Sequence, residues 1–405
     1  MLAEFIQNFE HNLFKPLLLF FYLGFLIPIL KVEFELPYVI YQGLTLYLLL
    51  AIGWHGGEEL AAIGASNIGR VAGFMLVGFV TNTAIGFLAY GLLSRMTGLR
   101  RVDKAAVAGH YGSDSAGTFA TCVAVLASAG IAFDGYLPVM LAVMEMPGCL
   151  VALYLVARLR HRGMDEAGNM PDEPGYVKRR VAKAASMVSG AAQLAAVDER
   201  AIEDELELSL EKREHPEHGD LVNGGASHVS AGNLAREIVL NPGLYLLFGG
   251  IVIGLISGLQ GEKVVHDGNL FYVTAFQGVL TLFLLEMGMT AARHLKDLKA
   301  AGRGFIAFGL LAPNLFAALG IVVAHGYAEL THTHLELGSY VLFAVITGAA
   351  SYIAVPAVQR MAIPEASPTL PLAASLGLTF AYNVTIGIPL YLGVVRLVTT
   401  HFPVG

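Results

Sequence analysis

The sequence predicts an all-α polytopic membrane protein with ten transmembrane helices arranged as two inverted repeats of five. Three observations lead to this fold class: a strongly apolar composition, ten apolar stretches of membrane-spanning length, and a pattern that recurs in both halves. Of the 405 residues, 55 % are hydrophobic and 14 % are charged, whereas a soluble domain carries about 25 % charged residues. The mean hydropathy is +0.62. This composition excludes a disordered chain, a coiled coil and a disulfide scaffold, and a net charge of −7 without a basic stripe argues against a nucleic-acid partner.

Ten stretches of the chain hold the roughly 20 mostly apolar residues that a helix needs to cross the hydrocarbon core of a membrane. They are residues 13–30, 36–54, 69–93, 104–129, 136–157, 238–259, 269–291, 303–327, 338–362 and 369–398. Lys15 precedes the first apolar run, as in a signal peptide, but no small-residue cleavage site follows it. We therefore expect this stretch to be the first transmembrane helix.

The charges between these stretches predict the orientation in the membrane. Lys and Arg gather around 94–104, in 158–235 and around 292–303, whereas the opposite loops carry acids such as Glu58 and Glu59. Because cytoplasmic loops are enriched in Lys and Arg, we place these three connections in the cytoplasm and both termini outside. The expected location is the cell inner (plasma) membrane, with a multi-pass chain in contact with membrane lipid.

The expected domain organisation follows from the polar middle of the chain. Residues 1–157 form the first inverted repeat, 158–237 a cytoplasmic linker, and 238–405 the second inverted repeat. Within the linker, the stretch from Asp198 to Asp220 is rich in acids that alternate with leucines. It is either a solvated, partly helical linker or a docking element for a cytosolic regulator, and the sequence leaves both interpretations open.

An internal repeat relates the two halves. Gly53 aligns with Gly288 at an offset of 235, and residues 112–115 (GSDS) align with 348–351 (GAAS) at an offset of 236. The ends of the fifth and tenth stretches align at an offset of 238. Because each repeat has an odd number of spans, the second must be inserted upside down. Inverted-topology repeats are typical of secondary transporters, whose substrate lies near the midplane where the repeats meet.

The fourth and ninth stretches are interrupted at equivalent points by Gly, Ser or Pro. The fourth reads AGHYGSDSAGTFATC and the ninth ITGAASYIAVPAVQ. Non-helical backbone at membrane depth is tolerated only where protein or a water-filled cavity satisfies it, and such pairs of interruptions mark transport sites. Half-helix N-termini there would attract an anion, while carbonyl and carboxylate oxygens would hold a cation such as Na⁺.

Asp114 is the most informative single residue, because a carboxylate at the bilayer centre costs about 2.5–3.5 kcal/mol on insertion scales. We interpret it as a cation or proton site, with a helix-cap role at the break as the alternative. Glu145 and Asn383 are polar at equivalent positions of the two repeats. The predicted ion-coupling residues are therefore Asp114, Glu145 and Asn383.

Small and hydroxyl side chains at the two breaks complete the candidate site. The predicted substrate-binding residues are Gly112, Ser113, Ser115, Thr118, Gly348, Ser351 and Tyr352. The predicted ligands of a Na⁺ ion are Asp114, Ser115 and Ser351. For the serines and the threonine, hydrogen bonds between helices are the alternative role, since these are frequent in membranes.

Three further features complete the prediction. His110 is a proton carrier or a hydrogen-bonded packing residue. Glu286 lies one turn before the polar end of the seventh stretch, and we expect it to reach the cytoplasmic interface. Gly250, Gly254 and Gly258 form a row of small residues that suits packing between helices of the chain or an oligomer interface.

At these motifs the chain resembles the sodium-dependent bicarbonate transporters of the cyanobacterial type, over about residues 16–157 and 240–397. The similarity is most specific at Gly112, Ser115 and Thr118, at Glu145-Met146-Pro147, at Met287-Gly288-Met289, and at Ser351 and Pro356. The resemblance implies a gate domain, a core domain with two crossing broken helices, and a homotrimer. It also implies uptake of bicarbonate with Na⁺ and inhibition by a PII-like cytosolic protein that senses adenine nucleotides.

The chain departs from the family pattern in the ninth stretch. The family has a run of serines followed by an aspartate there, whereas residues 348–352 read GAASY. Tyr352 stands at the place of the acid, and the carboxylate is instead Asp114, which mirrors Ala350 in the repeat. We expect this carboxylate to serve Na⁺ from the other half, and the altered hydroxyls bear on the identity of the anion.

The leading hypothesis is Na⁺-coupled uptake of bicarbonate or a similar small anion by alternating access, with Na⁺ as the coupling ion and no cofactor. One alternative is a Na⁺- or H⁺-coupled carrier of another small anion or carboxylate. Another is a non-transporting membrane sensor that signals through the linker. An enzyme is not expected, because the sequence offers no evident nucleophile–base pair or metal cluster, and His332 and His334 form a lone pair on an outer loop.

Overall fold

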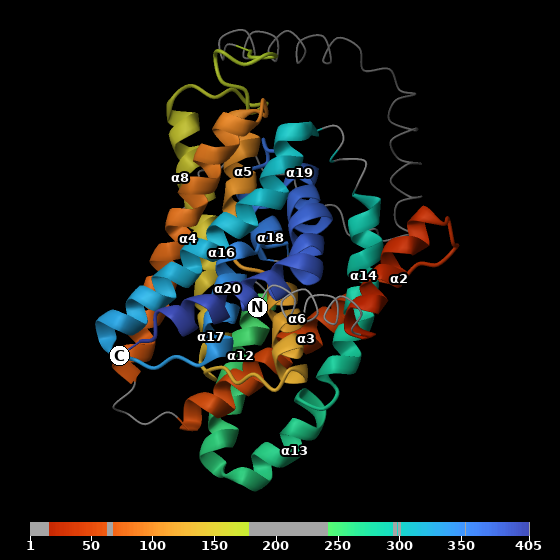
Figure 1. The fold of residues 1–405 in the computed structure, drawn as a ribbon. Helices are drawn as coiled ribbons and strands as arrows, with labels where there is room; N and C mark the ends of the chain where they lie inside the picture. Colours follow the sequence, from red (N-terminus) through yellow and green to blue (C-terminus); the bar gives the residue numbers. More distant parts are fainter. Residues whose placement is uncertain are drawn as a thin grey trace, which may run out of the picture.

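A computed structural model describes residues 16–62, 68–177, 242–294, 298, 301–352 and 354–404, and every regular element in these ranges is helical (Figure 1). The prediction of an all-α protein is thereby confirmed. The acidic stretch from Asp198 to Asp220 lies outside the described residues.

The first half consists of seven described helices. They are α2 (Pro16–Ile29), α3 (Tyr38–Ala62), α4 (Ile68–Met96), α5 (Arg101–Tyr111), α6 (Ala116–Ser128), α7 (Leu137–Met144) and α8 (Met146–His161). Helices α7 and α8 meet at Glu145, just before Pro147, whose ring nitrogen has no hydrogen to donate within the helix.

The second half begins with α12 (Pro242–Gln260), α13 (Glu262–Tyr272), α14 (Phe276–Arg293) and α16 (Arg303–Thr331). It continues with α17 (Leu337–Gly348), α18 (Ala354–Ala362), α19 (Thr369–Leu372), the π-helices η2 (Ala373–Phe380) and η3 (Asn383–Gly387), and α20 (Ile388–His401). Each of the ten predicted stretches thus contains at least one described helix, and the last contains four consecutive helical elements.

Six helical segments are long and apolar enough to cross a membrane: Val39–Ala61, Gly69–Met96, Leu137–His161, Glu262–Arg293, Arg303–Thr331 and Thr369–His401. Three shorter apolar helices, Leu18–Ile29, Tyr245–Gln260 and Leu337–Gly348, lie in further predicted stretches. The fourth predicted stretch is divided into α5 and α6, and the ninth into α17 and α18, at the interruptions seen in the sequence. The chain is therefore a helical protein with several segments that are long and apolar enough to span a membrane.

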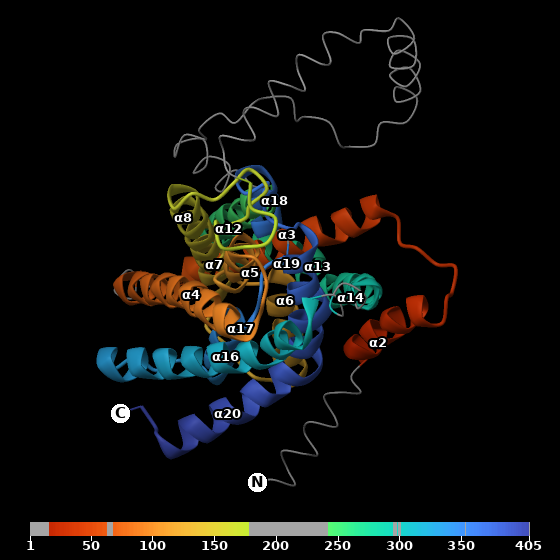
Figure 2. The ribbon, with the colours of Figure 1, turned by 90° about the horizontal axis from the view of Figure 1, so that it is seen from above.

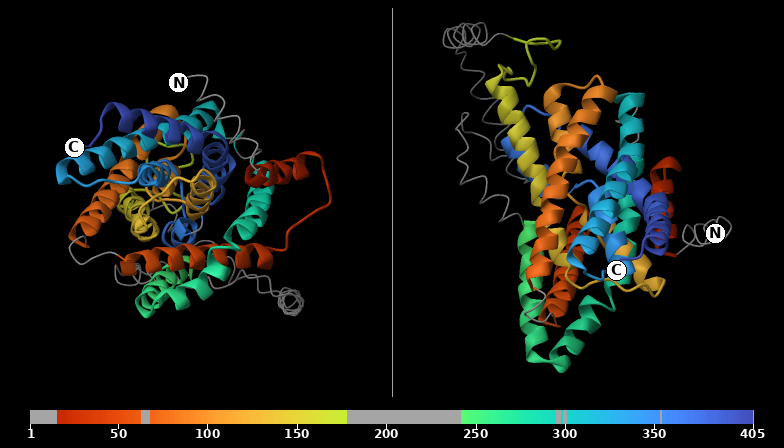
Figure 3. Two further views of the ribbon diagram at one scale, coloured as in Figure 1. Left: turned by 60° about the horizontal axis from the view of Figure 1, so that its bottom comes forward. Right: turned by 60° about the vertical axis from the view of Figure 1, so that its left-hand side comes forward.

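The described helices form two groups (Figures 2 and 3). In the main bundle, α4 lies beside α16, and α5 packs on α4 and α8. The outer group consists of α2, α3, α12, α13 and α14, in which α3 packs along α12 and α2 along α14.

Glycines set the close approach of α3 and α12. A Cβ on Gly254 would lie 2.2 Å from the carbonyl oxygen of Trp54, and one on Gly250 would lie 2.8 Å from that of Leu50. Gly258 in turn faces Ala61. The row of small residues predicted from the sequence is therefore a helix-packing surface within the chain.

The beginning of the linker packs near the start of α5 and the end of α8. Arg101 pairs with Asp172 at 2.5 Å, and Arg160 pairs with Glu365 at 2.8 Å. Asp165 accepts hydrogen bonds from the backbone N–H groups of Asn169 and Val177. Burial acts to raise the pKa of Asp165, but these hydrogen bonds outweigh it and lower the pKa.

We expect Asp165→Ala to open the turn of residues 162–177. Two charge-assisted hydrogen bonds are lost, so trypsin should cut at Arg162 about tenfold faster in detergent-solubilised protein. Because the folded-state pKa is lowered, the stabilising effect is present at neutral pH and is lost only as the pH falls through that lowered pKa. Glu166→Ala, a change of the exposed neighbouring acid, is the matched control. Equal cleavage rates of the two variants would contradict the assigned role of Asp165.

Candidate functional site

The first break joins α5 to α6 through residues 112–115. Helix α5 ends at Tyr111, and the N–H of Gly112 caps it by donating to the carbonyl of Ala108. Ser115 begins α6 as its N-cap, accepting a hydrogen bond from the N–H of Thr118 at 3.3 Å. Serine is among the preferred N-cap residues because its side-chain oxygen satisfies an N–H that has no partner within the helix.

The second break lies between Gly348 at the end of α17 and Ala354 at the start of α18. Ala349, which follows α17, is extended, with φ −91° and ψ 179°. Ala349 and Ala350 are buried, and Ser351 is 1 % exposed. The break therefore lies in the protein interior, where its polar backbone groups need partners.

The two breaks are in direct contact. The N–H of Ser351 donates to the carbonyl of His110 at 2.8 Å, and Nδ1 of His110 donates to the carbonyl of Ser351 at 2.6 Å. Gln359 of α18 donates to the carbonyl of Ala106 in α5 at 2.9 Å. The backbone exposed by each interruption is thus partly satisfied by the other half of the chain, and His110 has the hydrogen bond expected of a packing residue.

Glu145 lies between both breaks. Its backbone carbonyl accepts a hydrogen bond from Ser113 at 2.6 Å, and its Oε1 accepts one from Ser351 at 2.5 Å. The residue is 7 % exposed. It therefore connects the α7–α8 junction to a serine of each half.

Asp114 has the least satisfied side chain of the site. It is 0 % exposed, and neither carboxylate oxygen has a hydrogen-bond partner among the described residues. Its carboxyl group is close enough to that of Glu145 for the two to interact. Two buried carboxylates repel each other strongly unless a proton or a cation neutralises them. The pair is therefore a candidate cation-binding or proton-binding site.

The remaining hydroxyls lie at the start of α6. Thr118 donates to Ser115 at 2.8 Å, so the Ser115 oxygen accepts in both bonds that the structure describes for it. Its own hydroxyl proton can consequently be donated to another group. Tyr352 is 6 % exposed, and its hydroxyl has no hydrogen-bond partner among the described residues.

Aromatic residues of the outer group cover this end of α6. A Cβ on Gly117 would lie 2.0 Å from the Tyr352 hydroxyl and 2.8 Å from the ring of Phe283 in α14. Tyr41 of α3 stacks on Phe283 with ring centroids 6.0 Å apart. Gly117 is therefore needed for the close contact between the main bundle and the outer group at the site.

The predicted residues fall into two sets. Gly112, Ser113, Asp114, Ser115, Thr118, Glu145, Ser351 and Tyr352 lie at or between the two breaks. Gly348 and Asn383 lie at the end of α17, where the Asn383 amide donates to the Gly348 carbonyl at 2.9 Å and accepts from Tyr391 at 2.8 Å. Both functional atoms of the Asn383 amide are used in these bonds.

Sequence reasoning missed several residues around the site. Gln359 is a lone amide inside an apolar run, and this polar residue among apolar neighbours could have marked it as a candidate. Nothing in the sequence marks Tyr41, Phe283 and Gly117, because their proximity to the site depends on how the outer group packs against the bundle. Glu286, by contrast, was considered from the sequence. It is 8 % exposed and accepts a hydrogen bond from Thr290 at 3.2 Å, so its side chain is buried against α14 and its neighbours.

No curated protein matches the chain. The sequence model of one family, the Na⁺-dependent bicarbonate transporter superfamily, matches residues 16–396, nearly the whole chain. This is a family of transporters and not of enzymes. The resemblance stated from the motifs is confirmed, and the chain belongs to the Na⁺-dependent bicarbonate transporter superfamily.

Proposed function

We propose that the protein takes up bicarbonate together with Na⁺ by alternating access, with the site at the contact of the two breaks. The observation that supports this most directly is the buried pair of Asp114 and Glu145. Bound Na⁺ would offset one of the two negative charges of the pair, and the oxygens of Ser115 and Ser351 are of the type that hard cations prefer. Na⁺ bound there would also reduce the repulsion that an entering anion meets.

The start of α6 is the proposed place for the anion. Its N-terminal N–H groups carry partial positive charge. The Tyr352 hydroxyl and the Ser115 proton are the donors still available next to it. In this proposal Tyr352 supplies a hydrogen bond that the missing serines of the ninth stretch do not.

A cavity of about 450 Å³ supports an access route to the site. It is lined by His110, Pro356, Gln359, Ile363, Pro364, Ala366, Ser367, Pro368 and Pro371. His110 at its wall also contacts the Ser351 carbonyl. With the orientation predicted from the loop charges, this cavity faces the cytoplasm, so bicarbonate released from the site would leave through it.

Packing of the outer group supports the inverted repeat and, with it, ten spans. The equivalent of the α2–α14 contact under such a repeat is the α12–α3 contact, and both are extensive. The aligned glycines take part in the same way. A Cβ on Gly53 would lie 2.4 Å from the Leu247 carbonyl oxygen in α12, and one on Gly288 would lie 2.1 Å from the Phe21 carbonyl oxygen in α2.

The main bundle repeats this correspondence. Gly112 at the first break packs against Gly86 of α4. Gly348 at the second break packs against the backbone of Pro313 in α16. The helix before each break therefore rests on the long helix that precedes it in its own repeat. The inner-membrane location, the homotrimer and the PII-like regulator stay predictions from charge and resemblance.

The second candidate is a H⁺-coupled carrier of a small anion. It is favoured by the same pair, since one proton shared between Asp114 and Glu145 would remove one of their two negative charges and so relieve the repulsion, as a monovalent cation does. The third hypothesis is a membrane sensor, which differs from the two transport hypotheses because it would move no anion across the membrane. The proposal of Na⁺ coupling rests on the family.

Uptake of radiolabelled bicarbonate into proteoliposomes tests the proposal. An inward Na⁺ gradient is expected to drive accumulation, and an inward proton gradient of equal size without Na⁺ is not. Liposomes without protein give the background. Proton-driven accumulation without Na⁺ would favour the second candidate. No flux from folded protein would contradict bicarbonate transport, and other small anions and carboxylates would be tested next.

A further inference from the structure

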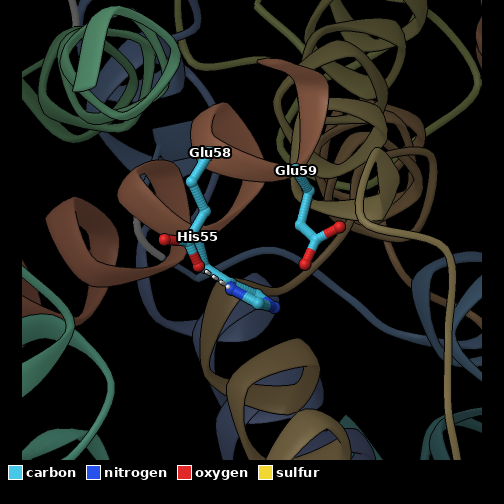
Figure 4. Close-up of side chains that lie close together, drawn as sticks. All are labelled: His55, Glu58 and Glu59. Carbon is cyan, nitrogen blue, oxygen red and sulfur yellow. Dashed lines mark hydrogen bonds and ion pairs between the residues drawn. The ribbon is translucent and has the colours of Figure 1, made fainter. Parts of the chain in front are cut away.

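Three potential metal ligands meet at the C-terminal part of α3, away from the two breaks. One ligand atom each from His55, Glu58 and Glu59 lies within 4.8 Å of the others. Figure 4 shows one oxygen of each carboxylate on the side of the His55 imidazole, while the second oxygen of Glu58 lies on the far side of that carboxylate. The spacing explains this, because residues three and four apart lie on the same face of an α-helix.

One of these ligands is buried and incompletely satisfied. The Glu58 side chain is 10 % exposed, and its Oε1 accepts a hydrogen bond from Nδ1 of His55 at 2.8 Å. Its Oε2 is buried and has no hydrogen-bond partner among the described residues. A buried carboxylate oxygen without a donor costs free energy, and a bound cation would satisfy it.

Neighbouring residues restrict the movement of the ligands. The ring of Phe133 meets the ring of His55 edge to face, with centroids 5.9 Å apart. A Cβ on Gly135 would lie 2.0 Å from the Cβ of Glu59, so this loop packs directly on that side chain. Ligands whose conformations are limited by packing bind an ion with less loss of entropy than free surface side chains do.

The ligand set selects the class of ion. Imidazole nitrogen suits Zn²⁺, Cu²⁺, Ni²⁺ and Fe²⁺, whereas Mg²⁺ and Ca²⁺ prefer ligands that are all oxygen. One His and two carboxylates leave a coordination position for water, as in three-ligand zinc sites. A simple ion pair between His55 and Glu58 accounts for neither the unpartnered Glu58 Oε2 nor the third ligand at Glu59.

We propose that His55, Glu58 and Glu59 bind a divalent transition-metal ion, with Zn²⁺ the best match. The site lies where α3 of the outer group meets the loop between α6 and α7. The predicted orientation puts it on the outer side of the membrane. Binding does not depend on that orientation or on the proposed transport activity.

Cobalt absorption provides the test, because Co²⁺ occupies zinc sites and its visible d–d bands report coordination. Purified, chelator-treated full-length protein without a polyhistidine tag is titrated with Co²⁺ in detergent. We expect visible bands that saturate at one Co²⁺ per chain, disappear on addition of Zn²⁺ and persist in excess Mg²⁺. Outer-shell partners alone are worth about 10–100-fold in metal affinity, so Glu58→Gln and Glu59→Gln should each weaken binding at least about tenfold.

His334→Gln is the matched control, since it removes a histidine from the loop between α16 and α17, on the same predicted side of the membrane. It should bind Co²⁺ like the unchanged protein. All variants are first checked for unchanged thermal unfolding without metal, and Glu59 is exposed, so Glu59→Gln is expected to fold normally. Absence of Co²⁺ bands in the unchanged protein, or equal affinity in Glu59→Gln, would overturn the proposal. Both readouts are spectroscopic, so they are independent of whether bicarbonate is transported.

Discussion

Asp114→Asn is expected to abolish Na⁺-driven uptake while the protein still folds and inserts. Both carboxylate oxygens of Asp114 are buried without a partner among the described residues, and the carboxyl group of Glu145 interacts with it electrostatically. Removing one member of a buried pair of opposite charges costs about 3–5 kcal/mol. For Na⁺ paired with the Asp114 carboxylate, loss of that carboxylate corresponds to binding weakened by more than about 100-fold.

The same substitution should not destabilise the protein. Asparagine has the shape of aspartate, and its amide can donate a hydrogen bond to the Glu145 carboxylate. The repulsion between two buried carboxylates is removed at the same time. We therefore expect the unfolding temperature without Na⁺ to be unchanged or higher. Na⁺ should raise the unfolding temperature of the unchanged protein, because a ligand that binds only the folded state stabilises it, and should not raise that of the variant.

Glu286→Gln is the control for removal of a buried carboxylate in the membrane. Glu286 is 8 % exposed and has one unpartnered oxygen, but it belongs to α14 of the outer group. Its variant should retain Na⁺-driven uptake and the Na⁺ effect on unfolding. If Asp114→Asn took up bicarbonate at the unchanged rate, the carboxyl pair would have no part in coupling. If Glu286→Gln lost both Na⁺-driven uptake and the Na⁺ effect on unfolding, the losses in Asp114→Asn would reflect removal of any buried carboxylate rather than a specific role of Asp114.

Hydropathy and interruptions in the sequence were sufficient to predict the helical class and the positions of both breaks. Helix α5 ends at Tyr111 and α17 at Gly348, inside the two predicted interruptions. Asp114 stood out because a carboxylate is rare in an apolar run. The glycine row on α12 was also readable, since small residues spaced by four lie on one face of a helix. These features depend on local composition and helical period alone.

Contacts between distant residues could not be predicted in the same way. The bonds between His110 and Ser351 join positions 241 residues apart, and no local pattern specifies them. Glu145 was predicted from its repeat mate Asn383, yet the two side chains have different partners. The sequence predicts that the second span ends at residue 54 and that Glu58 and Glu59 lie in a loop. This is wrong, because α3 continues to Ala62 and brings both acids and His55 onto one helical face.

Gly148→Ala is expected to destabilise the protein strongly, because α8 touches the first break at this residue. A Cβ on Gly148 would lie 2.0 Å from the carbonyl oxygen of Gly109 and 2.7 Å from the carbonyl carbon of Gly112. These are backbone atoms, so α5 and α8 must move apart. The same Cβ would lie 2.5 Å from the Ser113 hydroxyl, which holds the Glu145 carbonyl. Overpacking of this kind costs about 1–3 kcal/mol, and the shift also separates the groups that meet at Asp114.

The buried thiols of Cys122 and Cys149 allow this to be measured with a thiol-reactive dye during heating in detergent. Gly148→Ala should unfold at a lower temperature than the unchanged protein and lose Na⁺-driven uptake. Gly278→Ala is the matched control, since a Cβ there meets nothing within 4 Å and alanine favours the helix by about 0.5–1 kcal/mol. It should unfold at the same or a higher temperature. A Gly148→Ala protein with unchanged unfolding would mean that α8 does not pack on the break, and the placement of Glu145 between the two breaks would then be wrong.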